Sequence, residues 1–215
     1  MRKLSGLILG FVLVTGIGAA QMPPQKISGD VVALDGATLR LTSGGRIVSV
    51  KLADAARISA RSPATVGGIT PGAFVGATAV PQADGTLLAS EIQIFPESLR
   101  GTGEGHRPMA APAGATMTNA TVRAVTPAAA RNTMTNATVA SATSTPEGRT
   151  LKLTYTGGEK VVVVPGDALV FATDVGTRDL LVAGAHVVVY AQPQSDGMLV
   201  AERVSVGKDG YVPPR

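Results

Sequence analysis

PQADGTLLA, at residues 81–89, returns without a gap as PQSDGMLVA at residues 193–201. Upstream, TLRLT at residues 38–42 returns as TLKLT at residues 150–154, and a Gly-Gly pair follows in both copies. Both blocks recur 112 positions apart, so the repeated unit is a whole module and not a chance turn. Because self-similarity at a fixed spacing determines architecture, the repeat takes precedence over every other feature of the chain.

The first copy, residues 26–96, predicts a module of five short strands. Asp35-Gly36 favours a tight two-residue hairpin turn, and a final hairpin is expected around Asp84-Gly85. The stretch 53–72 is expected to be a long connection, with at most a short strand near residues 57–60. The expected strands are 27–34, 38–42, 47–52, 73–80 and 86–95.

The second copy, residues 136–208, predicts the same order of strands. Gly157-Gly158 and Asp196-Gly197 mark its tight turns, and residues 165–184 are expected to form its long connection. A tail at 209–215 follows. The expected strands are 138–142, 150–155, 160–164, 185–191 and 198–206.

A three-stranded meander, a long connection and a final hairpin form the strand order of the oligonucleotide- and oligosaccharide-binding (OB) barrel, which leaves few exposed strand edges. We therefore expect an all-β protein, with two tandem antiparallel five-stranded OB-like barrels. A crossover rich in Gly, Thr and Ala, residues 97–135, would join them. An open sheet or a sandwich is the alternative.

The turns also resemble those of a known family. Gly29 to Val32, Pro71 to Val75 and Asp84 to Ile92 in the first copy, and 183–187 and 196–199 in the second, are similar to secreted bacterial β-barrel modules classed as a domain of unknown function. The resemblance covers about two thirds of the chain. It implies a periplasmic, non-enzymatic protein, and it brings no catalytic residue with it.

Residues 1–20 have the pattern of a secretory signal peptide. Arg2 and Lys3 form a basic start, a mostly apolar run follows to Ile17, and small residues precede Gln21, the expected new N-terminus. The run is short for a membrane span, although a retained anchor is the alternative. We expect a bacterial protein in the periplasm or the medium, with no stable membrane insertion after cleavage.

Composition excludes several functions. The chain has no Cys, which rules out thiol chemistry, thiolate metal sites and disulfides. Its 19 Lys and Arg residues face 15 Asp and Glu residues, and cleavage after Ala20 would leave an excess of only two positive charges. Since nucleic-acid binding needs a strong basic field, we expect no nucleic-acid partner.

One segment of the crossover occurs twice. TMTNATV at residues 116–122 recurs at residues 133–139. A recent local duplication explains this recurrence, and the second copy is expected to start the second module while the first is a spare.

The densest polar stretch, residues 97–109, is the first candidate for a site. A docking or ligand loop laid across the barrels is one interpretation, and a solvated crossover with turn glycines is the other. An oligosaccharide or peptide in a barrel groove would use tyrosines as platforms. The candidate binding residues are Arg100, Glu104, His106, Arg107, Tyr155 and Tyr190.

A metal site is the alternative to a docking loop. Imidazole and thioether ligands suit Cu(I), and the crossover holds His106, Met109, Met117 and Met134. No nucleophile with a base and an orienting group stands out, so we expect no enzyme and no cofactor. A hydrolase using Glu104 and His106 is a third possibility.

We therefore expect an exported, non-enzymatic binding or scaffold protein that contacts an envelope protein or glycan through barrel surface and the inter-module loop. A periplasmic Cu(I)-binding protein is the alternative. The ligand and the oligomeric state are left open.

Overall fold

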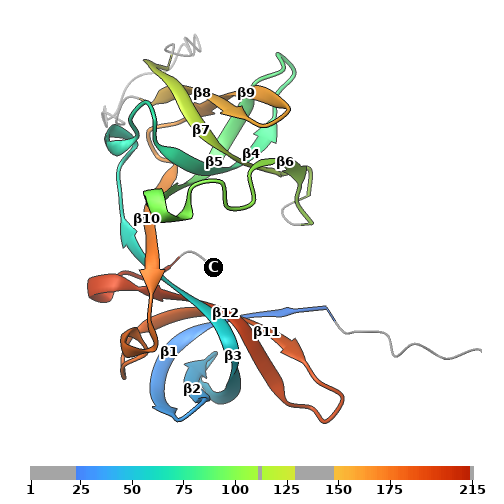
Figure 1. Ribbon diagram of the computed structural model, residues 1–215, viewed down its shortest axis with the longest axis vertical. Helices are drawn as coiled ribbons and strands as arrows, with labels where there is room; N and C mark the ends of the chain where they lie inside the picture. The colour runs from blue at the N-terminus through green and yellow to red at the C-terminus, as the bar shows by residue number, and fades with distance from the viewer. Residues whose placement is uncertain (1–22, 111–112, 129–147, 214–215) are drawn as a thin grey trace, which may run out of the picture.

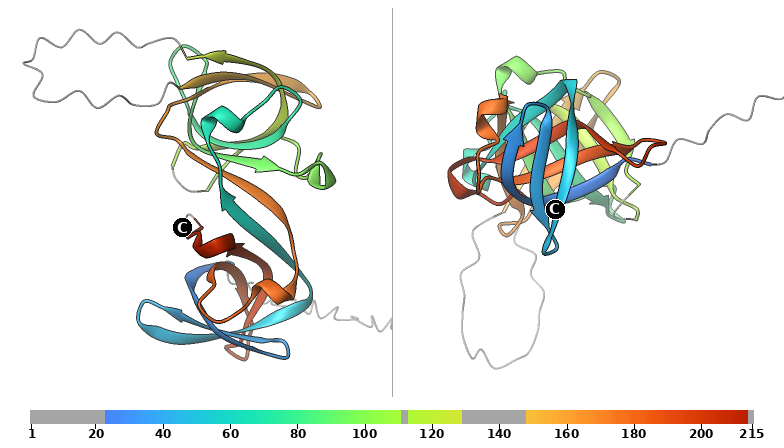
Figure 2. Two further views of the ribbon diagram at one scale, coloured as in Figure 1. Left: turned by 90° about the vertical axis from the view of Figure 1, so that its left-hand side faces the viewer. Right: turned by 90° about the horizontal axis from the view of Figure 1, so that it is seen from below.

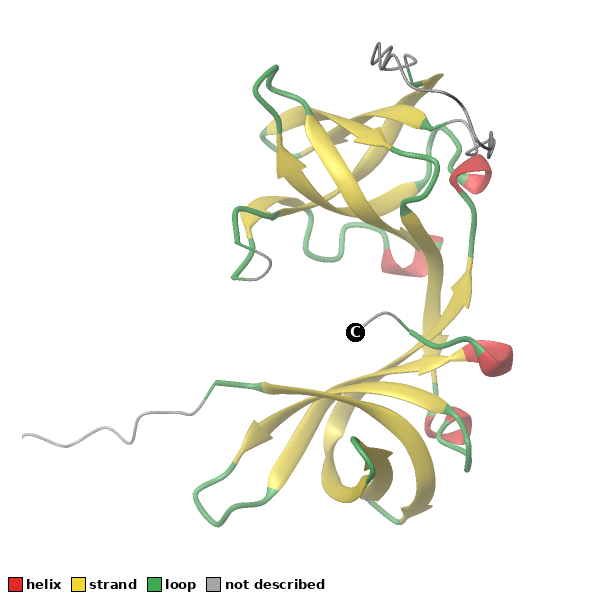
Figure 3. Ribbon diagram, turned by 180° about the vertical axis from the view of Figure 1, so that it is seen from behind, coloured by secondary structure: helices red, strands yellow, loops and turns green. Residues whose placement is uncertain are grey.

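The protein is all-β. A computed structural model describes residues 23–110, 113–128 and 148–213, which form twelve strands in one continuous sheet (Figure 1). Four short 3-10 turns accompany the strands (Figure 3), and none of the described helices is long and apolar enough to cross a membrane. The expected signal peptide, residues 1–20, lies outside the described residues.

The strands and 3-10 turns have the following bounds. The strands are β1 (Gln25–Asp35), β2 (Thr38–Ser43), β3 (Arg46–Pro63), β4 (Phe74–Pro81), β5 (Leu87–Phe95), β6 (Gly105–Pro108), β7 (Thr116–Pro127), β8 (Arg149–Tyr155), β9 (Gly158–Val164), β10 (Leu169–Gly176), β11 (His186–Pro193) and β12 (Leu199–Gly207). The 3-10 turns are η1 (Val66–Gly68), η2 (Glu97–Leu99), η3 (Arg178–Leu180) and η4 (Lys208–Gly210).

Two sets of five strands each close into a ring of pairings. In the first ring, β1 pairs with β2, β2 with β3, β3 with β12, β12 with β11, and β11 with β1. In the second ring, β7, β8, β9, β5 and β4 pair in the same cyclic way. Each ring contains one parallel pair, β3–β12 or β9–β5, and its other pairs are antiparallel. The rings lie at the bottom and the top of Figure 1.

Each ring takes strands from both halves of the chain. The meander β1–β2–β3 closes with the hairpin β11–β12, whereas the meander β7–β8–β9 closes with the hairpin β4–β5. The boundaries expected at 26–96 and 136–208 therefore do not coincide with the rings. The cause lies in β3, which continues to Pro63 through the residues expected to form a connection. As a result, the hairpin that follows β3, formed by β4 and β5, belongs to the second ring.

One strand, β10, joins the two rings by pairing antiparallel with β3 and parallel with β5. β10 lies within the connection expected at 165–184, and it runs antiparallel to the second half of β3 (Figure 2). Thr173 is the register partner of Arg61, and Thr173 follows Arg61 by the spacing of the sequence repeat. The two halves therefore meet symmetrically at this pair. The strands of one ring have counterparts in the other, although β3 is continuous where its counterpart is divided into β9 and β10.

The duplicated segment is used differently from the expectation. Its first copy, residues 116–122, forms the start of β7 and belongs to the second ring, so it is not a spare. The second copy, residues 133–139, and the strand expected at 138–142 lie outside the described residues. The crossover expected at 97–135 contains β6 and β7 and is not a linker throughout.

The register identifies β7 as the counterpart of β1. Val122 pairs with Leu153 as Val31 pairs with Leu41, and a register shift follows at the same place in both strands. These four side chains are almost fully buried, each inside its own ring. Aliphatic residues dominate both cores, since the chain has only four Phe, three Tyr and no Trp. The first core includes Leu39, Leu41, Val50, Leu52, Val189 and Val204, and the second includes Val75, Ile92, Leu151, Leu153, Val162 and Val164.

Candidate functional site

The chain that follows each hairpin folds back over its ring. After β5, η2 leads into residues 100–104 on the second ring, and after β12, η4 leads into Tyr211 to Pro213 on the first ring. Each segment leaves a 3-10 turn in the same way, because Arg100 N–H donates to the Glu97 carbonyl at 3.1 Å after η2 and Tyr211 N–H donates to the Lys208 carbonyl at 2.9 Å after η4. The rings differ in what these two segments carry.

On the second ring, Arg100 is held by several groups at once. Its guanidinium donates to the Gly72 carbonyl at 2.8 Å and to Thr121 Oγ1 at 3.1 Å, and it lies 5.9 Å from the centre of the Phe74 ring. It also forms a 2.5 Å ion pair with Glu97. The hydrogen bond from Arg100 lowers the pKa of the Glu97 carboxyl. Arg100 therefore fixes the segment to its own ring.

The residues after Arg100 continue this attachment. The Asn119 side-chain amide donates to the Thr102 carbonyl at 3.0 Å. The Glu104 carboxylate accepts hydrogen bonds from Thr156 N–H at 2.6 Å and from Thr156 Oγ1 at 3.1 Å. Arg107 donates to the Gly103 carbonyl at 2.8 Å. These side chains, predicted as ligand contacts, make contacts within the protein.

The structure does not bring the predicted copper ligands together. His106 pairs with Thr118, and its Nδ1 hydrogen bonds to Thr118 Oγ1 at 2.8 Å. Met117 is the register partner of Arg107, the residue next to His106. Because neighbouring residues of a strand point to opposite faces, the side chains of Met117 and His106 lie on opposite faces of the sheet. Burial lowers the pKa of His106, and Lys160 adds a smaller effect in the same direction.

The remaining predicted metal ligands add no shared site. Met109 is half-buried, and its N–H donates to the Ala115 carbonyl at 2.9 Å. Met134 lies outside the described residues. Among the residues that the structure describes, no group of three or more His, Asp or Glu side chains could hold a metal ion.

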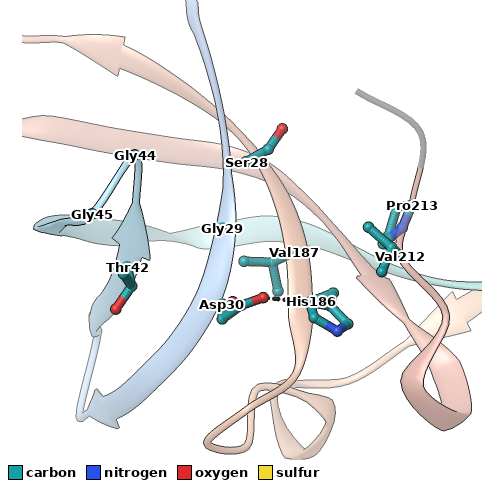
Figure 4. Close-up of a pocket in the computed structure, with 10 residues that line it drawn as sticks. All are labelled: Ser28, Gly29, Asp30, Thr42, Gly44, Gly45, His186, Val187, Val212 and Pro213. Carbon is teal, nitrogen blue, oxygen red and sulfur yellow. Dashed lines mark hydrogen bonds and ion pairs between the residues drawn. The ribbon is translucent and has the colours of Figure 1, made fainter.

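A pocket of about 350 Å³ lies on the first ring (Figure 4). Asp30 and His186 face each other within it, as register partners on β1 and β11, and the Asp30 carboxylate forms an ion pair with His186 Nδ1. The pocket is lined by Ser28, Gly29, Asp30, Thr42, Gly44, Gly45, His186, Val187, Val212 and Pro213. Because Asp30 is 54% exposed and His186 is 34% exposed, both side chains are accessible from solvent.

The pocket corresponds to the place that Arg100 fills on the second ring. Asp30 pairs with Thr42 and His186, and Thr121 pairs with Thr154 and Phe74 in the same arrangement. Val212 corresponds to Arg100 by the spacing of the sequence repeat, and it lines the pocket. A short valine therefore stands where a long guanidinium stands on the other ring, and space is left beside Asp30.

A row of basic residues crosses the first ring next to this pocket. Lys26, Tyr190, Arg203 and Arg57 are consecutive neighbours across β1, β11, β12 and β3, and we call them the basic row. The Arg203 guanidinium lies 4.5 Å from the centre of the Tyr190 ring, and Lys26 Nζ lies 5.8 Å from it. Among the described residues, no carboxylate lies within ion-pair distance of the three cations.

The second ring carries no such row. The counterparts are consecutive neighbours in the same order, and none of them is basic. They are Met117, Thr78, Glu91 and Leu169. The fold therefore does not require cations at these positions.

Where the rings meet, Arg61 stands close to groups from both of them. Its guanidinium lies 4.7 Å from the centre of the Phe171 ring, and burial lowers its pKa. Burial also raises the pKa of Glu91 on β5, against the opposing effects of Arg61 and Lys26. Tyr211 interacts electrostatically with both Arg61 and Glu91. The covering segment of the first ring therefore lies within reach of the second.

The two predicted tyrosine platforms have different surroundings. Tyr155 packs against the core of the second ring, and Tyr190 lies between two cations on the first. Sequence reasoning does not identify Asp30, His186 or the basic row as a site. Their neighbours come from the other half of the chain. The available signal was alternation, which places Lys26 and Arg203 on the outward side of their strands.

The comparisons with known proteins identify a family. No curated protein and no solved structure matches the chain. A family model described as a domain of unknown function, DUF5666, matches residues 26–93 and 161–205, together more than half of the chain. The matched segments include strands of both rings. The chain therefore belongs to the DUF5666 family.

Proposed function

We propose that this protein is an exported, non-enzymatic binding protein that contacts an acidic glycan of the bacterial envelope through the basic row. The basic, apolar and small-residue segments of positions 1–20 support export to the periplasm. In both rings a meander and a hairpin close through one parallel pair, which supports two repeated OB-like barrels with exchanged hairpins.

The basic row carries this proposal. Three cations without a carboxylate at ion-pair distance among the described residues repel one another, and they offer charge to a ligand. Because the second ring forms the same fold with neutral or acidic residues at these positions, stability does not explain the cations. Glu91 acts electrostatically on Lys26 from beyond ion-pair distance, and an external anion would pair with the three cations directly.

Tyr190 holds two cations of the row in position for an anion. Its ring holds the Arg203 guanidinium and the Lys26 ammonium by cation–π attraction, which reduces the conformational entropy lost on binding. The row crosses three strand spacings, or about 14 Å. This length suits several anionic groups of an extended chain better than one isolated anion.

The surroundings of the row favour a glycan over other polyanions. Single-stranded nucleic acid needs open aromatic faces on which its bases stack, and Tyr190, the one aromatic residue of the row, is half-buried beside two cations. At the centre of the row β11 and β12 are paired on both sides, so a peptide could not add a strand there, although β1 at Lys26 and β3 at Arg57 are each paired on one side only. Carboxylate-bearing sugars need neither feature.

Binding to polygalacturonate, a linear polyuronate, tests the proposal. We expect the purified protein to bind it at low salt, with an affinity that falls as salt rises, and to ignore an uncharged dextran. Arg203→Gln should weaken binding about tenfold, or about 1.4 kcal/mol, whereas Arg46→Gln, at the distant start of β3, should leave it unchanged.

Tyr190 provides a second readout. Tyr190→Phe keeps the ring and should keep binding, while Tyr190→Leu should weaken it because the two cations lose their support. Equal affinity of wild-type protein and Arg203→Gln for polygalacturonate would contradict the proposal. Tighter binding to an oligodeoxythymidylate of matched charge would assign the row to nucleic acid instead.

A further inference from the structure

We infer that the pocket at Asp30 and His186 binds an extended peptide segment of a partner protein, with a basic residue and an acidic residue four positions later. This site is separate from the glycan surface. The second ring supplies the template, because residues 100–104 of the chain itself occupy the matching place there.

The template defines what each part of the pocket would contact. On the second ring the guanidinium of Arg100 reaches Thr121 and lies over Phe74, and four residues later the Glu104 carboxylate accepts the Thr156 N–H. The covering segment thus places one positive and one negative group at opposite ends of the site. Charge-assisted hydrogen bonds of this kind are stronger than neutral ones.

The first ring offers counterparts for three of the groups that the template contacts. Asp30 stands in the position of Thr121, and His186 stands in that of Phe74. Gly44 stands in the position of Thr156 by the sequence repeat, and it lines the pocket. The Asp30 carboxylate already bonds to His186 Nδ1, and because its side chain remains 54% exposed it can accept from a further basic group. The Gly44 N–H would donate to an acidic group of the peptide, as the Thr156 N–H donates to Glu104.

The chain's own covering segment leaves this place open. Val212 occupies the position of Arg100 and has no group to donate to Asp30, and Pro213 follows it along the pocket wall. The Asp30 carboxylate is more than half exposed. The volume of about 350 Å³ accommodates a basic side chain with adjoining backbone. The peptide therefore fills the space that valine leaves.

The chain contains its own probe for this site. A synthetic peptide of residues 97–108, ESLRGTGEGHRP, carries the template contacts. In the full-length protein the second-ring site is already filled by the same residues, so the added peptide should bind the first ring. We expect chemical-shift changes at Thr42, Gly44 and Gly45, with a dissociation constant below about 1 mM.

Variants on both sides test the contacts. Asp30→Asn keeps the shape of the side chain and should weaken binding about tenfold, as should glutamine in place of the peptide's arginine or glutamate. Asp54→Asn, a matched change at an exposed aspartate outside the pocket, should have no effect. Val212→Arg should abolish binding, because it supplies the missing guanidinium from the chain itself.

The results of the peptide experiment can be distinguished from those of the polygalacturonate experiment. Shift changes confined to the basic row, or no shift changes at 5 mM peptide, would overturn the inference. So would binding that survives both Asp30→Asn and Val212→Arg. Retained polygalacturonate binding by Asp30→Asn would show that the protein is intact and that the two sites are distinct.

Discussion

Thr173 on β10 is the register partner of Arg61 on β3, and the two residues hold the same position in the two halves of the chain. The pairing of β10 with β3 is therefore symmetric in its backbone register, but one of the two equivalent positions holds a charged arginine and the other a neutral threonine. Arg61 lies over the buried Phe171 ring and within electrostatic reach of Glu91, which is a counterpart of Arg203. The basic row and its counterpart on the second ring, which holds Glu91 and no cation, differ in charge in the same way.

Matched core truncations should destabilise the protein equally in either ring. Leu41 and Leu153 are counterparts, and both are fully buried. Leu→Ala at either position should lower the free energy of unfolding by about 2–5 kcal/mol. Because each ring holds strands from both halves, we expect one shared denaturant transition to shift in both variants.

Ile47→Ala is the control for these truncations, since Ile47 is 64% exposed and its loss should change stability by less than about 0.5 kcal/mol. Two separate transitions, with each variant moving only one of them, would contradict the expectation of a shared unit.

Glu91 should make stability depend on pH. The pKa of Glu91 is raised in the folded state. The stability that protonated Glu91 contributes is therefore fully present below the pKa of the unfolded state. That stability is lost as the pH rises through the pKa of the folded state. Glu91→Gln removes a half-buried charge that lacks an ion pair among the described residues. It should stabilise the protein at pH 7 by about 1 kcal/mol, or about 2–4 °C in Tm.

Below about pH 4, where a free glutamate is itself largely protonated, the advantage of Glu91→Gln should vanish. Arg61 and Lys26 oppose the shift of Glu91, so the comparison is made with both unchanged. Thermal unfolding of wild type, Glu91→Gln and the exposed control Glu202→Gln across pH 3–8 checks the sign. A variant that is less stable than wild type at pH 7 would show that attraction by Arg61 outweighs burial.

Gly29 should not tolerate a side chain. A Cβ at this position would lie 2.1 Å from the Thr42 carbonyl oxygen, which belongs to the backbone of the neighbouring strand. Gly29→Ala must therefore separate β1 from β2 at the pocket, and we expect a loss of about 1–3 kcal/mol.

Gly67→Ala is the matched control for Gly29→Ala, because its Cβ would meet Thr65 Oγ1 at an ordinary 3.5 Å. Circular dichroism melts compare the two variants. Equal Tm values would mean that the strands at Gly29 adjust without cost.

Local features of the fold could be predicted from the sequence. Asp84-Gly85 and Asp196-Gly197 correctly marked the hairpins β4–β5 and β11–β12. Alternating apolar residues placed β1 and β2 within a few residues of their ends. Turn chemistry and alternation are properties of neighbouring residues, so one sequence contains them.

The partners of the strands could not be predicted in the same way. Residues 53–63 continue β3 across to the other ring, and nothing in their composition distinguishes a crossing strand from a loop that turns back. This choice decides which hairpin closes each ring. It therefore decides that Asp30 meets His186 and that Lys26 meets Tyr190.

The first copy of TMTNATV illustrates a further limit. Its sequence is identical to that of the second copy, so propensity alone cannot choose between them. In the structure Asn119 donates to the Thr102 carbonyl, and β6 pairs alongside residues 116–119. Such contacts with preceding residues favour the first copy, and they depend on tertiary structure.

The central claim is that the hairpin of each half of the chain closes the ring formed by the meander of the other half. Cutting the chain tests this claim most directly. A protease recognition sequence placed between Ala128 and Gly148 divides the protein into a piece with β1–β7 and a piece with β8–β12. With exchanged hairpins both rings need both pieces. The fully cut protein, verified on a denaturing gel, should elute as one species in size-exclusion chromatography and separate only in denaturant. Two separate folded pieces without denaturant would contradict the account.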